Sequence, residues 1–267
     1  MIEFSMKRFK LIIKDAVKEL SRVDRKIIII FLSVAVLEIL SWYYTSRNFF
    51  HENLYYKYFV DNPNVDLYEF LYWFLGDFIV FLIIPLLIIK FWFKEEIKNY
   101  GMKLGEYKEG ISISMMLIAI MLIIVWFASA TEDFYTQYPL LYLTKYNWNI
   151  FFLFEIFLFI YIVAWEFIWR GYMLFGLEEK FGFYSIFVQM IPFVILHNGK
   201  PVAEAFGAIL GAIILGILAL RTRSFFYGVV IHFTTVFSID LISILRYRYN
   251  EYGVGLSSIL KIITKTL

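Results

Sequence analysis

The residues best suited to chemistry in this sequence are a glutamate, an arginine and two histidines that stand in or beside strongly apolar runs. Glu166 and Arg170 lie in the segment Ala164–Gly171, and His197 and His232 follow in two later apolar segments. A charge at membrane depth costs roughly 2.5 kcal/mol or more, so such residues are usually paired, face a cavity and mark function. One carboxylate and two imidazoles can do acid–base chemistry on water, and they also resemble a zinc ligand set. We therefore interpret the three segments as the walls of one site.

The spacing of Glu166 and Arg170 predicts an ion pair. Residues four apart lie on one face of a helix, and glutamate ahead of arginine is the favourable order. A purely structural ion pair is the alternative to a functional one. In the same way, His197 could be a helix-end cap and His232 an interfacial histidine.

The composition places the chain in a membrane. Of its 267 residues, 61% are hydrophobic, whereas soluble domains average about 45–50%. The expected fold class is all-α, a polytopic membrane helix bundle. The chain has no cysteine, which excludes disulfides and thiol catalysis. Its net charge of +2 gives no indication of nucleic-acid binding, and no such partner is expected.

Hydropathy and length predict about seven membrane spans, with a weak eighth segment in the C-terminal tail as the alternative. Four regions follow: an amphipathic N-terminal segment (1–26), N-terminal transmembrane helices (27–147), a core that carries all the candidate residues above (148–245) and a tail (246–267). The seven spans are Ile27–Tyr44, Phe70–Phe93, Ile111–Ala130, Trp148–Arg170, Phe183–His197, Ala205–Leu220 and Phe226–Leu245.

The distribution of lysine and arginine predicts the orientation. Both are abundant in residues 1–26 and recur in the loops after the second and sixth spans. Cytoplasmic loops carry such an excess, so we expect a multi-pass protein of the cell membrane with a cytoplasmic N-terminus. Residues 1–26 alternate basic and apolar side chains, which is typical of a helix on an anionic lipid surface. An ordinary positive flank for the first span is the alternative.

Three motifs in order resemble the CPBP family of intramembrane proteases, which includes the type II CAAX prenyl endopeptidases and the Abi proteins. The family carries Glu-Glu-x-x-x-Arg, then Phe-x-x-x-His, then a helix with a histidine that is often followed four residues later by asparagine. The matching positions here are Glu166 to Arg170, Phe193 to His197, and His232.

Two positions depart from the family motifs. Trp165 stands where the family has its first glutamate, the residue usually assigned to activating water, and Val236 stands at the asparagine position. Neighbouring helix residues point about 100° apart, so Glu166 can replace that glutamate only if the helix is rotated or locally distorted. Glu204 and Asp240 are the alternative sources of a carboxylate.

The resemblance implies an endopeptidase that hydrolyses a peptide bond with a glutamate-activated water and two histidines. Glu166, His197 and His232 are then the expected catalytic residues, supported by Arg170, Glu204 and Asp240. The implied mechanism is free of metal and cofactors, with zinc as the less favoured alternative because His-Glu-x-x-His is absent. The expected partners are the lipid bilayer and a membrane-associated or lipid-modified peptide or protein substrate. An inactive CPBP-like protein that regulates a membrane partner and a small transporter are the alternatives.

Overall fold

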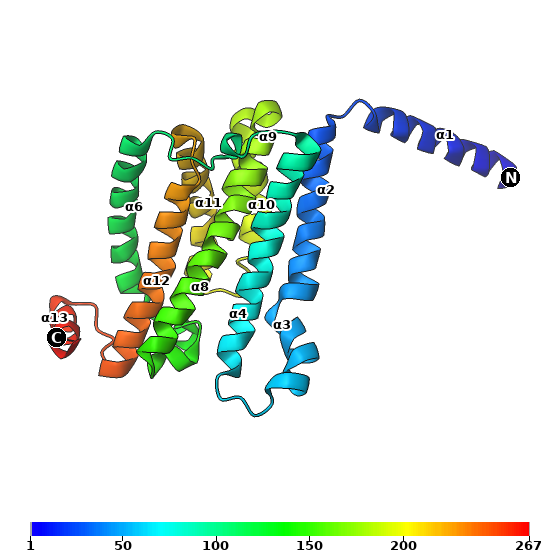
Figure 1. Ribbon diagram of the computed structural model, residues 1–267. Coiled ribbons are helices and arrows are strands. Elements are labelled where there is room, and N and C mark those ends of the chain that lie inside the picture. Colours follow the sequence, from blue (N-terminus) through cyan, green and yellow to red (C-terminus); the bar gives the residue numbers. More distant parts are fainter. Residues whose placement is uncertain (1, 267) are drawn as a thin grey trace.

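The protein is a bundle of helices in the computed structural model, which describes residues 2–266 and contains no strand among them (Figure 1). Six helical stretches are long and apolar enough to cross a membrane, which confirms the predicted all-α polytopic fold class. They are Arg25–Phe59, Val65–Phe93, Tyr107–Ala128, Trp148–Ile195, Val202–Thr222 and Phe226–Tyr249.

Each stretch is built from one or more helical segments. The α-helices are α1 (Ile2–Leu20), α2 (Arg25–Leu40), α3 (Arg47–Phe50), α4 (Val65–Phe78), α5 (Ile84–Leu87), α6 (Tyr107–Ala128), α7 (Glu132–Gln137), α8 (Trp148–Glu166), α9 (Leu174–Phe181), α10 (Ser185–Ile195), α11 (Val202–Thr222), α12 (Phe226–Tyr249) and α13 (Leu256–Thr266). The π-helical segments are η1 (Ser41–Thr45), η2 (His51–Phe59), η3 (Ile79–Ile83), η4 (Ile88–Phe93) and η7 (Phe167–Met173), and the short 3₁₀ turns are η5 (Ile97–Tyr100), η6 (Tyr142–Lys145) and η8 (Gly182–Tyr184).

The fourth and fifth predicted spans form one continuous stretch that turns at Gly182. α8, η7 and α9 run without a break to Phe181, and Gly182 then adopts a φ of 51°, a conformation that glycine reaches without strain. α10 has only 11 residues. At 1.5 Å per residue it is about 16 Å long, which is roughly half of the ~30 Å hydrocarbon core. The helix that leads to His197 therefore ends at mid-bundle depth.

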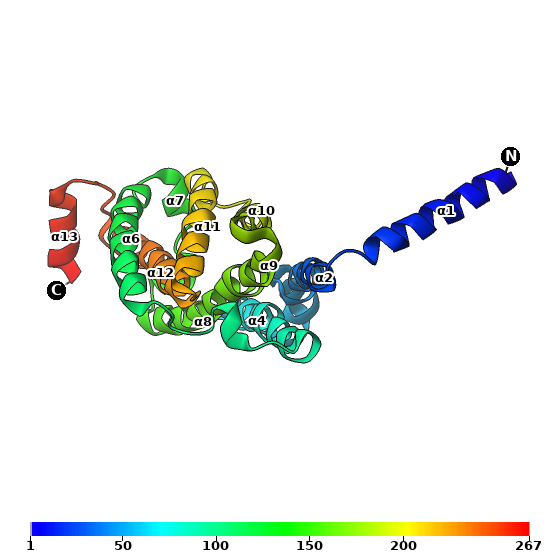
Figure 2. The same ribbon diagram turned by 90° about the horizontal axis from the view of Figure 1, so that it is seen from above.

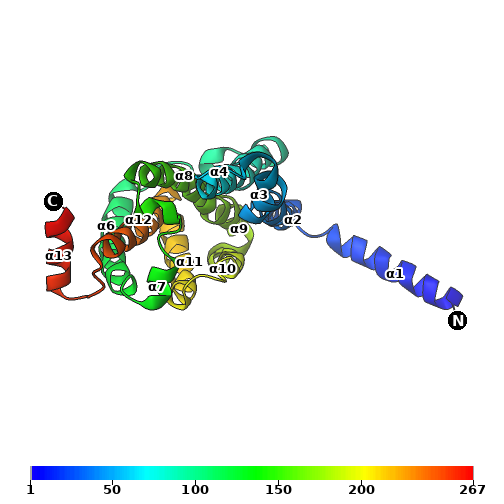
Figure 3. The ribbon, with the colours of Figure 1, turned by 90° about the horizontal axis from the view of Figure 1, so that it is seen from below.

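The stretch that contains α8 is the centre of the bundle. Of its 18 most apolar consecutive residues, 56% are buried, whereas the corresponding share in α6 is 11%. α8 packs between α4 and α12, as both end-on views show (Figures 2 and 3). Glu166 therefore lies in the protein interior, whereas most of α6 is left to face lipid.

The basic segments that were expected on one side of the membrane gather at one end of the bundle (Figure 1). Lys26 donates to Glu95 in the loop after η4, at 2.8 Å. Arg223, at the end of α11, binds Glu178 near the end of α9. The arrangement of the loops agrees with the lysine and arginine distribution, and the cytoplasmic assignment of this end stays a prediction.

Two amphipathic helices lie outside the bundle. α1 extends away from it, with Phe9, Ile12 and Val17 exposed (Figure 1). α13 has 11 residues, fewer than the roughly 20 that a spanning helix needs. Up to residue 266, the tail therefore contains no helix long enough to form the eighth span that was the alternative in the sequence.

Candidate functional site

The helix that carries the first motif changes its geometry directly after Glu166. α8 ends there, and the chain continues as the π-helical segment η7, which contains Arg170. A π-turn has one more residue per hydrogen-bonded ring than an α-turn, so it shifts the side chains that follow around the helix axis, and such turns are frequent at functional sites. Every residue from Ala164 to Leu177 is buried. The distortion is thus fixed by packing on all sides.

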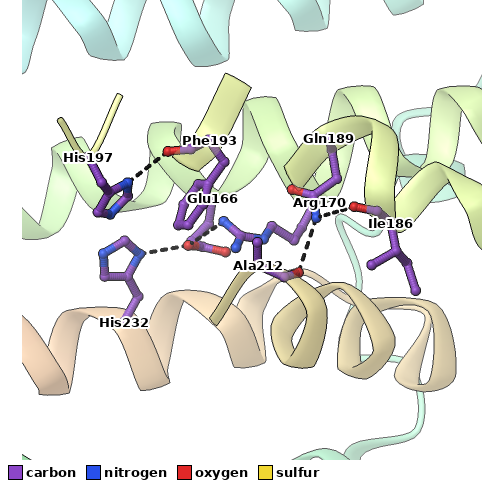
Figure 4. Close-up of polar contacts among 8 residues, drawn as sticks. All are labelled: Glu166, Arg170, Ile186, Gln189, Phe193, His197, Ala212 and His232. Carbon is purple, nitrogen blue, oxygen red and sulfur yellow. Dashed lines mark hydrogen bonds and ion pairs between the residues drawn. The ribbon is translucent and has the colours of Figure 1, made fainter. Parts of the chain in front are cut away.

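Glu166 is the centre of a buried polar cluster. Its side chain is fully buried, and its Oε1 accepts from Arg170 Nη1 at 3.0 Å and lies 2.7 Å from His232 Nδ1 (Figure 4). A carboxylate has no proton to donate, so Nδ1 of His232 is the donor in this contact. The bond fixes both the tautomer and the orientation of the His232 ring.

His197 follows α10 at the break between the second motif helix and α11. Its Nδ1 donates to the carbonyl oxygen of Phe193 at 2.7 Å, and the two rings lie 4.6 Å apart. The guanidinium of Arg170 also lies over the Phe193 ring, 4.1 Å from its centre. Gln189 donates to the carbonyl of Ala212 at 3.1 Å and holds α10 against α11 (Figure 4).

A cavity of about 770 Å³ opens beside the two histidines. His197, His232 and Trp165 line it together, and the rings of Trp165 and His197 meet edge to face with 6.3 Å between their centres. The cavity continues to α2, α3 and α4, where it is lined by polar side chains that include Glu38, Arg47, Glu69 and Asp77. It is large enough to hold several residues of a peptide.

Glu166 does not line this cavity. The cavity-facing position of the motif is occupied by Trp165, and Glu166 lies behind it with no exposed surface. The helix distortion therefore does not bring the Glu166 carboxylate to the place that a side chain at position 165 would occupy. Glu166 is linked to the cavity by its hydrogen bond to His232, which lines the cavity.

Glu204 is a carboxylate that does line the cavity. Its Oε2 accepts from the hydroxyl of Tyr138 at 2.5 Å, and Lys200 lies 3.9 Å from its Oε1. Burial and the neighbouring Glu204 raise the pKa of Tyr138 well above its ordinary value, so the hydroxyl stays protonated and can donate this bond. Glu204 is therefore already held by two partners.

Asp240 lies two turns beyond His232 and away from the cavity. It is buried, and its Oδ1 accepts from the backbone of Leu140 at 3.0 Å. Its Oδ2 and both carboxylate oxygens of Glu155 on α8 are buried without a hydrogen-bond partner among the described residues. Asp240 thus holds α12 to the loop before η6, and none of its hydrogen bonds goes to the histidines.

The sequence reasoning missed Glu38 and Asp77, which line the far part of the cavity. Asp77 is 1% exposed and accepts from Thr45 and from the indole of Trp73, at 2.5 and 2.7 Å. Both carboxylates stand alone within predicted apolar spans. An isolated acid in such a span indicates a cavity, so this signal was present in the sequence.

Several donor atoms of the cluster already have hydrogen-bond partners. Glu166 Oε1 already lies between Arg170 and His232, and the Nδ1 atoms of both histidines are used. Within residues 2–266, no group of three or more His, Cys, Asp or Glu side chains could hold a metal ion. The metal-free mechanism stays a prediction.

Comparison with known families gives a match over the central part of the chain. Residues 146–238, about a third of the sequence, match the type II CAAX prenyl endopeptidase Rce1-like family. These residues include Glu166, Arg170, His197 and His232. No curated protein and no solved structure matches the chain.

Proposed function

Because residues 146–238 carry an Rce1-like domain of the CPBP family, we propose that this protein is a membrane endopeptidase that cleaves a membrane-associated or lipid-modified peptide. The observation that carries the proposal is the 2.7 Å contact between Glu166 and His232 Nδ1, made at the edge of a cavity that both histidines line. A buried carboxylate that orients an imidazole in this way prepares the other ring nitrogen to act as a base.

The first step is the activation of water. With Nδ1 of His232 donating to Glu166, the lone pair of Nε2 is free to accept a proton from a water molecule in the cavity. His197 donates its Nδ1 proton to Phe193, so its Nε2 can accept the second hydrogen of the same water and align it. The carboxylate thus acts through the histidine, which refines the expectation of a water activated directly by glutamate.

The second step is cleavage of the peptide bond. The water oxygen attacks the carbonyl carbon while its proton passes to His232, and Glu166 stabilises the imidazolium that forms. Collapse of the tetrahedral intermediate breaks the carbon–nitrogen bond. The proton on His232 then passes to the leaving amine, which returns the imidazole to its starting state.

An inactive CPBP-like protein that binds a membrane partner is the second candidate. Trp165 favours it, because this large side chain lines the cavity at the position where the family has its water-activating glutamate. The two candidates make opposite predictions for hydrolysis.

The test is cleavage of a panel of membrane-anchored peptides, with and without lipid modification, by the purified protein in lipid nanodiscs. Loss of a general base or of its orienting carboxylate should lower kcat at least ~100-fold in His232→Gln and in Glu166→Gln. Glu179→Gln, at an exposed helix end, is the matched control and should keep full activity. Absence of cleavage across the panel favours the inactive candidate, and unchanged cleavage by His232→Gln refutes this mechanism.

A further inference from the structure

The glycine one turn before His232 lies against the Glu166 carboxylate. Gly228 and His232 are four residues apart on α12 and therefore share a helix face. A Cβ atom on Gly228 would lie 2.8 Å from Glu166 Oε2 and 3.6 Å from its Cδ. The first distance is shorter than real Cβ contacts, so an alanine here requires the carboxylate to move.

The carboxylate is not free to move. Its Oε1 is held by Arg170 and His232, and the side chain is completely buried. Oε2 has no hydrogen-bond partner among the described residues, so only packing against Gly228 and its surroundings determines where it lies. Displacing Oε2 therefore also displaces Oε1 from Nδ1 of His232.

No backbone requirement explains a glycine at this position. Gly228 is a buried residue in the first turns of a regular 24-residue helix, and its φ is not positive. Glycine weakens a helix interior relative to alanine. The space for Oε2 is the structural feature that compensates for that loss.

We infer that Gly228 is a positioning residue: the absence of a side chain lets the Glu166 carboxylate lie against α12 and hold His232 Nδ1. Its importance for catalysis rests on the function proposed above. Its effect on the His232 ring does not, and it can be measured without a substrate.

The experiment is ¹⁵N NMR of histidine side chains in the full-length protein in nanodiscs. The chain has only three histidines, so His51→Gln and His197→Gln suffice to assign the His232 signals. Wild-type protein should show His232 with a protonated, hydrogen-bonded Nδ1 and a bare Nε2. Gly228→Ala should abolish this single tautomer, and should lower kcat at least ~100-fold with little change in KM where a substrate is known.

Gly211→Ala on α11 is the matched control, because a Cβ there meets no atom within 4 Å. It should leave the His232 spectrum unchanged. An unchanged His232 tautomer in Gly228→Ala overturns the inference, whether or not the protein cleaves peptides. Conversely, a wild-type His232 tautomer as expected, with no cleavage of any peptide, would reject the proposed function alone.

A second comparison covers the case in which Gly228→Ala does not fold. In the background Glu166→Ala with Arg170→Met, the carboxylate that Cβ would meet is gone. Adding Gly228→Ala to this background should be tolerated, with an unfolding midpoint no lower than that of the background. A further loss of folding there would show that Gly228 contacts something other than Glu166, and would refute the inference.

Discussion

Replacing Arg170 by methionine should destabilise the protein by about 3–5 kcal/mol, the usual cost of leaving one member of a buried ion pair without its partner. Arg170 and Glu166 are both fully buried and lie 3.0 Å apart. At that distance, two charges attract each other by about 5.5 kcal/mol for an effective dielectric constant of about 20. Methionine keeps an apolar chain of similar length over Phe193, so the loss reports mainly on the charge.

The assay is unfolding of the purified protein in detergent micelles by added SDS, followed by the fluorescence of its seven tryptophans. Arg223→Met is the control, because Arg223 and Glu178 are 43% and 31% exposed and such pairs contribute about 0–1 kcal/mol. The double variant Glu166→Gln with Arg170→Met should recover much of the stability, because it removes both charges. A loss below about 1 kcal/mol in Arg170→Met, or additive losses in the double variant, would refute the reasoning.

Three other substitutions test the site, the helix contacts and the orientation. Trp165→Glu places a carboxylate in the cavity beside His197 and should raise the rate of peptide cleavage; an unchanged rate would show that the cavity cannot use it. Asp240→Asn should keep a free energy of unfolding within about 1 kcal/mol of wild type, because the amide oxygen can still accept from the backbone of Leu140, whereas Asp240→Ala should lose about 1–3 kcal/mol. Lys98→Cys in this cysteine-free chain should react with an impermeant maleimide only from the cytoplasmic side, and labelling from outside would refute the predicted orientation.

The spans were predictable because lipid exposure imposes long apolar runs on the sequence. The expected spans 111–130, 205–220 and 226–245 agree with α6, α11 and α12 to within a few residues. The continuation of the fourth span to Phe181 was missed, since hydropathy falls at Glu178 while the helix does not end. Hydropathy reports which residues prefer lipid. Glu178 lies beyond the apolar run but is still helical, and Arg223 is its ion-pair partner.

The site was predictable only as a set of residues on three helices. The sequence identified Glu166, His197 and His232, since polar side chains are rare in such segments. The contact between Glu166 Oε1 and His232 Nδ1 uses the space left by Gly228, which has no signal in hydropathy or spacing. The cavity wall formed by α2, α3 and α4 lies outside the three motifs and was missed for that reason.

The chemistry proposed above has to account for Trp165, which departs from the CPBP motif that this chain resembles. A glutamate at position 165 would face the cavity and take a proton from water directly. Here Trp165 covers that wall, and the carboxylate of the next residue is turned toward Arg170 and His232. A carboxylate behind an imidazole still determines which nitrogen carries the proton. In the mechanism proposed above, the negative charge acts one hydrogen bond away from the water, and the base is the histidine.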